Sequence, residues 1–279
     1  MFGSGIELKT EDQIRRMRRS GLIVAEVLST LGDAAAPGMA TRDLDRLARE
    51  ILASHGALSS FLNYGADWGI APYPAVTCIS VNEEIVHGIP GDRVLQDGDI
   101  VSVDFGAILD GWHGDAARTF LIGDVDDQSR TLSDVTREAL WAGIGAAKLG
   151  HRIGDISQTI EASITSHGRS YGIVREYTGH GIGSEMHQPP DVPNHGRRGR
   201  GAKIAKGLCI AIEPMATLGT EQTVTLDDDW TVITADRSRS AHWENTITVT
   251  KHGIWVLTEA DGGEAELTAR GLPFGPLAD

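Results

Sequence analysis

Cysteine is scarce in this sequence: Cys78 and Cys209 are the only two among 279 residues, which excludes a disulfide framework. Basic residues are also few, and the resulting net charge of -14 excludes a general binder of nucleic acids or anionic membranes. No apolar run approaches the roughly 20 residues that cross a membrane, and the first residues lack the apolar segment of a signal peptide. We therefore expect a cytoplasmic protein, in a reducing compartment, that binds neither DNA nor membranes.

The sequence does contain enough apolar residues for a sizeable core, at 41% of the chain. Its length allows one large domain or two small ones. Periodic apolar residues predict helices and short strands, with helices over about 11–31, 42–55, 133–149 and 155–167, and strands at 76–81 and 84–86. Thr41 is predicted to cap the second helix, which Gly56 ends.

A β-hairpin is predicted over residues 101–120, VSVDFGAILDGWHGDAARTF. Apolar residues alternate along its first strand, and Asp110-Gly111 is a strong turn signal. Pairing about this turn places Asp104 opposite Ala117 and puts Asp115 on the same face, one diagonal neighbour away. Two carboxylates in one small volume repel each other, so they need a shared proton or a bound cation.

The sequence also contains an internal repeat. Four segments of its first half match four segments of its second half in the same order: 41–56 with 152–168, 85–92 with 185–191, 97–104 with 206–213, and 111–122 with 240–250. The matches align His87 with His187, Asp104 with Glu213, and Asp115 with Glu244. We predict two related α+β halves, at about 11–123 and 133–258, whose pseudo-twofold axis brings the four carboxylates together. Chance similarity, the alternative, does not explain the shared order.

The second pair of carboxylates lies in an equally apolar setting. Glu213 follows the strand CIAI, and Pro214 then interrupts the ladder. A single acidic residue in a strand usually faces solvent, but four that converge beside the one charge of Arg118 need cations. His180 lies between glycines in TGHGIG, where the backbone can approach a neighbour closely. Alone, that motif is more typical of a turn histidine.

Taken together, these residues resemble the methionine aminopeptidases of the short bacterial type. The resemblance covers roughly residues 8–258 and is carried by the stretches CISVNEEIVHGIP, DGDIVSVDFGAILDGWHGD, GHGIG, MHQPP, IEPM and DWTVITADRSRSAHWENTITVT. It implies the pita-bread fold, which agrees with the two predicted halves. We accordingly expect a loose arm at 1–10, one catalytic domain at 11–258 and a surface tail at 259–279.

The resemblance implies that the enzyme removes the initiator methionine from nascent chains with two divalent ions, of Co, Mn, Fe, Zn or Ni. It implies five metal ligands, of which two bridge both ions: Asp104, Asp115 (bridging), His180, Glu213 and Glu244 (bridging). It further implies that Glu213 shuttles a proton, that His187 stabilises the oxyanion, and that His87 contacts the scissile amide nitrogen.

The resemblance also implies an apolar pocket for the methionine side chain, lined by Tyr73, Cys78, Met186 and Trp230. Each of these residues is equally typical of ordinary packing. The sequence departs from the family here, because the loop at 63–75 is longer than usual and Met186 replaces an aromatic residue.

Three alternative functions remain open at this point. One is another pita-bread peptidase of the Xaa-Pro type, although such enzymes normally carry a large extra domain for which the sequence has no room before residue 10. Another is a metal-free binding module on the same fold. Against it, all five ligand positions hold side chains that can bind a metal ion. The last is a plain acidic α+β scaffold, which leaves the repeated carboxylates unexplained.

Three weaker signals concern partners and ions. Four arginines of the first helix form a basic patch: Arg15, Arg16, Arg18 and Arg19. A transient ribosome contact is one interpretation, and a solvated helix face paired with nearby acids is the other. The tract 196–203, GRRGRGAK, is too short to indicate RNA binding. By resemblance, Asn82, Glu84 and Ser240 are candidate oxygen ligands for a monovalent cation. Nothing indicates an obligate interface, so a monomer is expected.

Overall fold

A computed structural model describes residues 5–278 and shows helices packed on antiparallel sheets, so the predicted α+β class is confirmed. The first half contains α1 (Glu11–Ala34), α2 (Thr41–Ser54), β1 (Leu58–Ser59), β2 (Thr77–Val81), β3 (Glu84–Val86), β4 (Ile100–Leu109) and β5 (Trp112–Leu121). The second half contains α3 (Asp127–Ala146), α4 (Ile153–Thr165), β6 (Gly172–Ile173), β7 (Gly179–Gly181), β8 (Gln188–Val192), β9 (Cys209–Ile212), β10 (Met215–Thr217), β11 (Thr223–Thr225), β12 (Val232–Thr234), β13 (Ser240–His242), β14 (Asn245–Val249), β15 (Ile254–Val256) and α5 (Glu264–Ala269).

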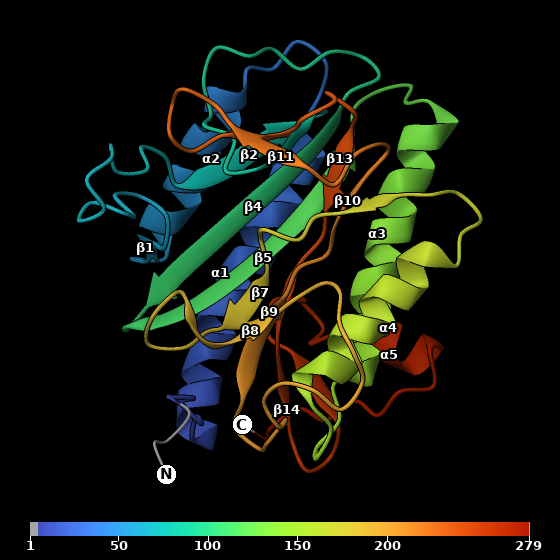
Figure 1. The fold of residues 1–279 in the computed structure, drawn as a ribbon. Helices are drawn as coiled ribbons and strands as arrows, with labels where there is room; N and C mark the ends of the chain where they lie inside the picture. Colours follow the sequence, from blue (N-terminus) through green and yellow to red (C-terminus); the bar gives the residue numbers. More distant parts are fainter. Residues whose placement is uncertain (1–4, 279) are drawn as a thin grey trace.

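The hairpin of β4 and β5 has the predicted turn and register. Asp110 and Gly111 both have positive φ (51° and 78°), which is typical of a two-residue type I′ turn. The register pairs Asp104 with Ala117 and Gly106 with Asp115, so the two carboxylates occupy diagonal positions on one face. In Figure 1 the hairpin crosses in front of α1, which packs against both strands.

The helix behind the hairpin is fixed at its start and at its middle. Thr10 and Gln13 form a capping box that satisfies the first backbone donors of α1. Gly21 is required in its middle because a Cβ there would lie 2.0 Å from the carbonyl oxygen of Leu257. This close approach seats α1 between the hairpin and the segment that follows β15.

Four sheets build the two halves and join them. In the first half β4 pairs with β1, β2 and β5, and in the second half the five-stranded sheet has the order β15-β14-β9-β7-β8. A third sheet, β13-β10-β6, lies beside it, and a fourth joins β3 of the first half to β12 of the second. The helices α3 and α4 pack side by side over the second-half strands and cover the larger apolar core (Figure 1).

All four predicted helices are present, with shifted ends. The helix α3 starts at Asp127 rather than at 133, because the Asp126 carboxylate accepts hydrogen bonds from two backbone N–H groups of its first turn. The prediction that Thr41 caps α2 is wrong. Ala40 holds the cap position, and the Thr41 hydroxyl bonds with the backbone of Gly91 instead.

The described residues near each end of the chain make close contacts that the sequence did not predict. Within the surface tail predicted at 259–279, the described residues 259–278 contain α5, and Leu267 is fully buried. Arg18 holds this segment by donating hydrogen bonds to carbonyl oxygens at 257, 259 and 260. Six residues make fewer than two helical turns, too few for a periodic signal.

Of the predicted loose arm, residues 1–4 lie outside the described part of the chain. Lys9 is buried, and its backbone N–H donates to the Gly207 carbonyl oxygen at 2.7 Å. Residues near 9 therefore lie against the second half. Within residues 5–278, no helix combines the length and the apolar character that a membrane crossing requires.

Candidate metal centre and active site

The two halves meet through a reciprocal exchange of hydrogen bonds. The Asp115 N–H donates to the Thr246 hydroxyl at 3.2 Å, and the Glu244 N–H donates to the Ala117 carbonyl oxygen at 2.9 Å. Each acidic residue thus bonds to the residue two positions beyond the other, which is the arrangement that a twofold axis between them requires.

Four carboxylates gather around this axis. They come from β4 (Asp104), β5 (Asp115), the end of β9 (Glu213) and the end of β13 (Glu244). Asp115 and Glu244 are 3% and 2% exposed, and the Glu213 side chain is 12% exposed. Burial raises the pKa of Asp104 to about 7 and that of Glu213 to about 8. Burial, followed by repulsion from neighbouring carboxylates, raises the pKa of Asp115 and of Glu244 well above the usual range.

The donor set fits bound cations. One oxygen each of Asp104, Asp115 and Glu244 is buried and has no hydrogen-bond partner among the described residues. A buried oxygen without a partner costs free energy, and a metal ion removes that cost. Ligand atoms of Asp115, His180 and Glu244 lie within 4.8 Å of one another, which is close enough for one ion. Carboxylates with one imidazole suit a divalent first-row metal.

His180 presents a free ring nitrogen to this cluster. Its Nδ1–H donates to the Gly181 carbonyl oxygen at 3.0 Å, which leaves the lone pair on Nε2. Nε2 lies 3.6 Å from Glu213 Oε1 and 3.9 Å from Asp115 Oδ2. The flanking glycines permit this position, because a Cβ at Gly179 or Gly181 would lie 2.4 Å from a carbonyl oxygen of a neighbouring strand.

The two other predicted histidines, His87 and His187, both line the same cavity. His87 has φ of 59°, a left-handed conformation that is uncommon for a non-glycine residue and typical of functional sites. Burial, and then the neighbouring His187, lowers the pKa of His87 to about 4, so its ring is neutral at pH 7. The His187 ring lies 4.3 Å from that of His180, centroid to centroid, and its Nδ1 is 2.5 Å from the Tyr64 hydroxyl.

The four predicted pocket residues form one apolar cluster beside the carboxylates. Tyr73, Cys78, Met186 and Trp230 pack together with Phe61, and all five are buried. Cys78 on β2 is the cross-strand partner of Asp104, so the cluster begins next to the acidic site. The Trp230 indole N–H donates to the Ala71 carbonyl oxygen at 2.7 Å and thereby fixes the loop at 63–75 against the cavity.

Two residues of this site, His242 and Tyr64, were not predicted from the sequence. His242 lines the cavity at 2% side-chain exposure, with Nε2 3.8 Å from Glu213 Oε2. Burial lowers the pKa of His242 to about 3. The internal repeat contained the signal, because aligning Asp115 with Glu244 also aligns His113 with His242. The contact of Tyr64 with His187 has no such signal, since the two residues are far apart in the chain.

The weaker signals have local explanations in the structure. Arg15, Arg16 and Arg19 pair with Glu11, Asp12 and Asp110, respectively. For the candidate monovalent cation site, the Glu84 carboxylate pairs with Arg93 at 2.6 Å, and the Asn82 side chain accepts from the Ile100 N–H. The Ser240 hydroxyl donates to the Ala216 carbonyl oxygen.

Comparison with known proteins agrees with this geometry. The model of metallopeptidase family M24 matches residues 15–251. The methionine aminopeptidase of Clostridium acetobutylicum is 48% identical, over 91% of this chain and 98% of that protein. The crystal structure of methionine aminopeptidase from Thermotoga maritima superposes with a TM-score of 0.87 at 40% identity, over 91% of this chain and 99% of that one.

A more distant structure shares the fold alone. Prolidase from Pyrococcus furiosus has a TM-score of 0.70 at 20% identity, over 90% of this chain and 65% of that one. The predicted pita-bread fold is thereby confirmed. The chain belongs to metallopeptidase family M24, within its methionine aminopeptidases.

Proposed function

We propose that this protein hydrolyses the first peptide bond of chains that begin with methionine, with two divalent ions held by the carboxylate cluster. The observation that carries the proposal is the cluster of four carboxylates next to an apolar cavity. Three of them, Asp104, Asp115 and Glu244, have a buried oxygen without a hydrogen-bond partner within residues 5–278. Asp115 and Glu244, which face each other across the pseudo-twofold axis, would bridge the two ions. Asp104 would complete one position, and His180 with Glu213 the other.

Bound divalent ions supply Lewis acidity and lower the pKa of water at the site. The protein supplies the remaining steps. Glu213 accepts a proton from the attacking water and passes it to the leaving amine, a role that suits a carboxylate with a raised pKa. The free α-amino group of a substrate would bind at one of the two metal positions, which would favour cleavage at the chain end.

The two histidines that line the cavity, His187 and His87, act on the scissile bond. The Tyr64 hydroxyl can donate to Nδ1 of His187, and that tautomer leaves a proton on Nε2 for donation to the developing oxyanion. His87, which lines the same cavity, contacts the scissile amide nitrogen. Its ring is held by edge contacts with Tyr177 and Trp230, at centroid distances of 5.4 and 6.2 Å.

The apolar cluster selects the first residue of the substrate. Its aromatic walls (Phe61, Tyr73 and Trp230) and its sulfur-bearing residues (Cys78 and Met186) match the thioether of methionine in polarity. An apolar cavity discriminates by size and polarity, so a shorter or charged first residue loses transition-state binding.

We propose nascent chains and peptides as the partners, a monomeric enzyme and a cytoplasmic location. The excess of acidic residues and the scarcity of cysteine support this setting. A ribosome contact through the arginines of α1 would have to displace their acidic partners, so we propose it only as a transient one. The monovalent cation near Asn82, Glu84 and Ser240 also stays a proposal.

The test is an assay of metal-stripped protein reconstituted with Co, Mn, Fe, Zn or Ni in turn. We expect release of methionine from Met-Ala-Ser, no cleavage of Ala-Pro peptides, and two ions per chain by elemental analysis. Preferred cleavage of the Ala-Pro peptide would instead support an Xaa-Pro peptidase. The proposal is wrong if methionine is released with none of these metals, and binding of Met-Ala-Ser without turnover would indicate a binding module.

A further inference from the structure

His242 lies inside the carboxylate cluster, and none of the roles described above uses it. Its side chain is 2% exposed and lines the same cavity as Asp104 and Glu213. Its Nε2 atom is buried and has no hydrogen-bond partner within residues 5–278. A buried polar atom in this condition is costly, so a binding partner of this nitrogen is expected in the working enzyme.

The distances around His242 match those around His180. His242 Nε2 lies 3.8 Å from Glu213 Oε2 and 3.9 Å from Glu244 Oε2. His180 Nε2 lies 3.6 Å from the other oxygen of Glu213 and 3.9 Å from Asp115 Oδ2. These separations are too long for hydrogen bonds. They fall within the range of roughly 3–4 Å that separates two donor atoms bound to one ion at about 2.1 Å.

The backbone of His242 is fixed by the strands that carry the first-half carboxylates. Its N–H donates to the Thr119 hydroxyl at 3.0 Å and to the Ser102 hydroxyl at 3.2 Å. The Thr119 hydroxyl in turn lies 2.8 Å from the His242 carbonyl oxygen. Ser102 and Thr119 are cross-strand partners in β4 and β5. The imidazole is therefore held in register with Asp104 and Asp115, as a metal ligand must be.

The internal repeat supplies a contrast. The repeat aligns His113 with His242, two residues ahead of Asp115 and Glu244, respectively. His113 is also buried, but its Nδ1 bonds with the Ser60 hydroxyl at 2.9 Å. The first-half histidine is thus satisfied within the protein, whereas the second-half histidine points an unsatisfied nitrogen at two carboxylates.

We infer that His242 is a sixth protein ligand, whose Nε2 binds the ion held by Glu213 and Glu244. The second-half metal position then has two imidazole ligands, His180 and His242, while the position at Asp104 has only oxygen ligands. This inference rests on the proposed metal-dependent function. It makes the two positions differ in donor type, so the nitrogen-rich position prefers softer first-row ions and fills first.

The test compares wild type with His242→Gln, and uses His113→Gln as the matched control. Each protein is stripped of metal, checked by thermal melting, and titrated with Co²⁺ while heat and visible absorption are recorded. We expect His242→Gln to weaken binding of the first Co²⁺ by at least about tenfold and to change its absorption bands. His113→Gln should change the affinity by less than about threefold.

X-ray absorption spectroscopy of the Co²⁺-loaded proteins counts the imidazoles directly. We expect two imidazole ligands per chain in wild type and one in His242→Gln. Equal affinities and one imidazole in wild type would overturn the inference while leaving the proposed function intact. Absence of Co²⁺ binding by wild type would overturn both. If His242→Gln fails to fold, the imidazole count of wild type alone decides.

Discussion

The two halves of the molecule hold equivalent carboxylates by different means. In the first half, Asp104 and Asp115 lie inside two uninterrupted ten-residue strands that a two-residue turn joins. In the second half, Glu213 lies in the gap between β9 and β10, and Glu244 in the gap between β13 and β14. On each side of these gaps the strands belong to different sheets.

The difference shows where each half obtains its rigidity. A continuous antiparallel ladder fixes the direction of every side chain along it, so the first half needs no further support. At a gap between strands the ladder is absent, and other hydrogen bonds must replace it. The Asn194 amide donates to the Glu213 carbonyl oxygen at 3.0 Å, and Arg118 from the first half donates to that of Glu244.

The largest expected effect comes from removing the charge of either residue that we propose to bridge the two ions. Asp115→Asn and Glu244→Gln keep the shape of the side chain but would weaken a ligand shared by both ions. We expect each to lower methionine release by more than about a hundredfold, because loss of a group that only orients a ligand already costs about 10–100-fold. Elemental analysis should show fewer than two ions per chain in both variants.

The surface variant Asp126→Asn, which caps the start of α3 and pairs with Arg239 at 2.9 Å, is the control and should retain both ions. An active, fully loaded Glu244→Gln would show that the second half contributes no bridging ligand. The two halves would then be unequal in chemistry as well as in support.

The metal-free protein should lose stability as the pH rises from about 6.5 to about 8. The folded-state pKa values of Asp104 (about 7) and Glu213 (about 8) exceed those of the unfolded chain, so folding takes up protons in this window. Stability is therefore highest at the lower pH and falls by about 1.4 kcal/mol per pH unit for each proton taken up. The buried histidines have lowered pKa values and contribute an opposite slope only below about pH 6.5.

Urea unfolding of the chelator-treated protein at several pH values measures this loss. Asp104→Asn and Glu213→Gln should each reduce the slope of the unfolding free energy against pH. A reduction of similar size in both variants would show that burial of a carboxylate costs the two halves the same free energy. Saturation with metal should remove most of the slope, since bound cations replace the protons. A slope that is flat or rising above pH 7 in the metal-free protein would contradict the assignment.

The sequence predicts the first half of the site better than the second. The positions of Asp104 and Asp115 follow from alternation and from one turn, because a hairpin register is decided locally. Glu213 and Glu244 were predicted through the repeat, since their own strands are too short and interrupted to show a pattern. His242 was overlooked although the same alignment contained it.

Contacts between segments that lie far apart in the chain could not be predicted from the sequence. The position of Tyr64 next to His187 depends on the path of the long loop at 63–75, which Trp230 fixes from a third part of the chain. The segment that leads to α5 is held by hydrogen bonds from Arg18 to the carbonyl oxygens of Glu259 and Ala260, which form only in the folded state. Neither arrangement leaves a periodic or compositional trace.

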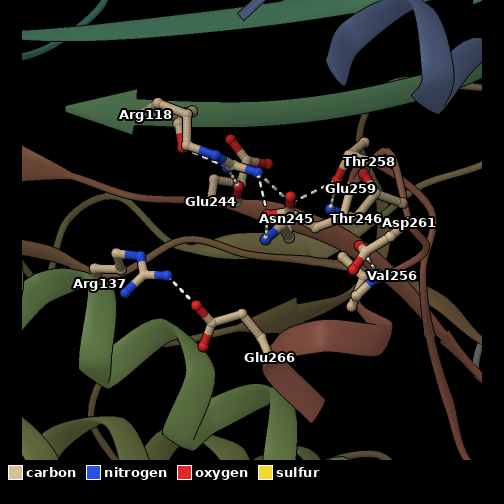
Figure 2. Close-up of polar contacts among 12 residues, drawn as sticks. Arg118, Arg137, Glu244, Asn245, Thr246, Val256, Thr258, Glu259, Asp261 and Glu266 are labelled. Carbon is tan, nitrogen blue, oxygen red and sulfur yellow. Dashed lines mark hydrogen bonds and ion pairs between the residues drawn. The ribbon is translucent and has the colours of Figure 1, made fainter. Parts of the chain in front are cut away.

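A smaller effect is expected from changing Arg118, which joins the two halves by hydrogen bonds and an ion pair. Figure 2 shows Arg118 of β5 reaching the segment that contains Glu244, Asn245 and Glu259. Lysine cannot make these contacts at once, because it has one donor group instead of a fork. We expect Arg118→Lys to weaken metal binding by about tenfold, as for other groups that orient a ligand.

Arg137→Lys is the matched control for Arg118→Lys. Both arginines pack on the ring of Trp243. Arg137, however, pairs with Glu266 of α5, away from the carboxylates (Figure 2). Calorimetric titration of both variants with Mn²⁺ measures the difference. Equal affinities in the two variants would show that Glu244 keeps its position without the Arg118 guanidinium, and that the gap between β13 and β14 needs no support from it.

The smallest effect concerns the two histidines on the cavity walls, which repeat the contrast between the halves. His87 of the first half is set by its own left-handed backbone, whereas His187 of the second half depends on the Tyr64 hydroxyl. Tyr64→Phe removes one hydrogen bond, worth about 0.5–1.5 kcal/mol, so kcat should fall by roughly two- to tenfold. KM should change little, because the bond fixes a tautomer that matters mainly in the transition state.

Tyr177→Phe, beside His87, is the control and should leave kcat nearly unchanged, since Tyr177 contacts that ring only by its edge. A larger loss in Tyr177→Phe than in Tyr64→Phe would mean that the backbone alone does not position His87.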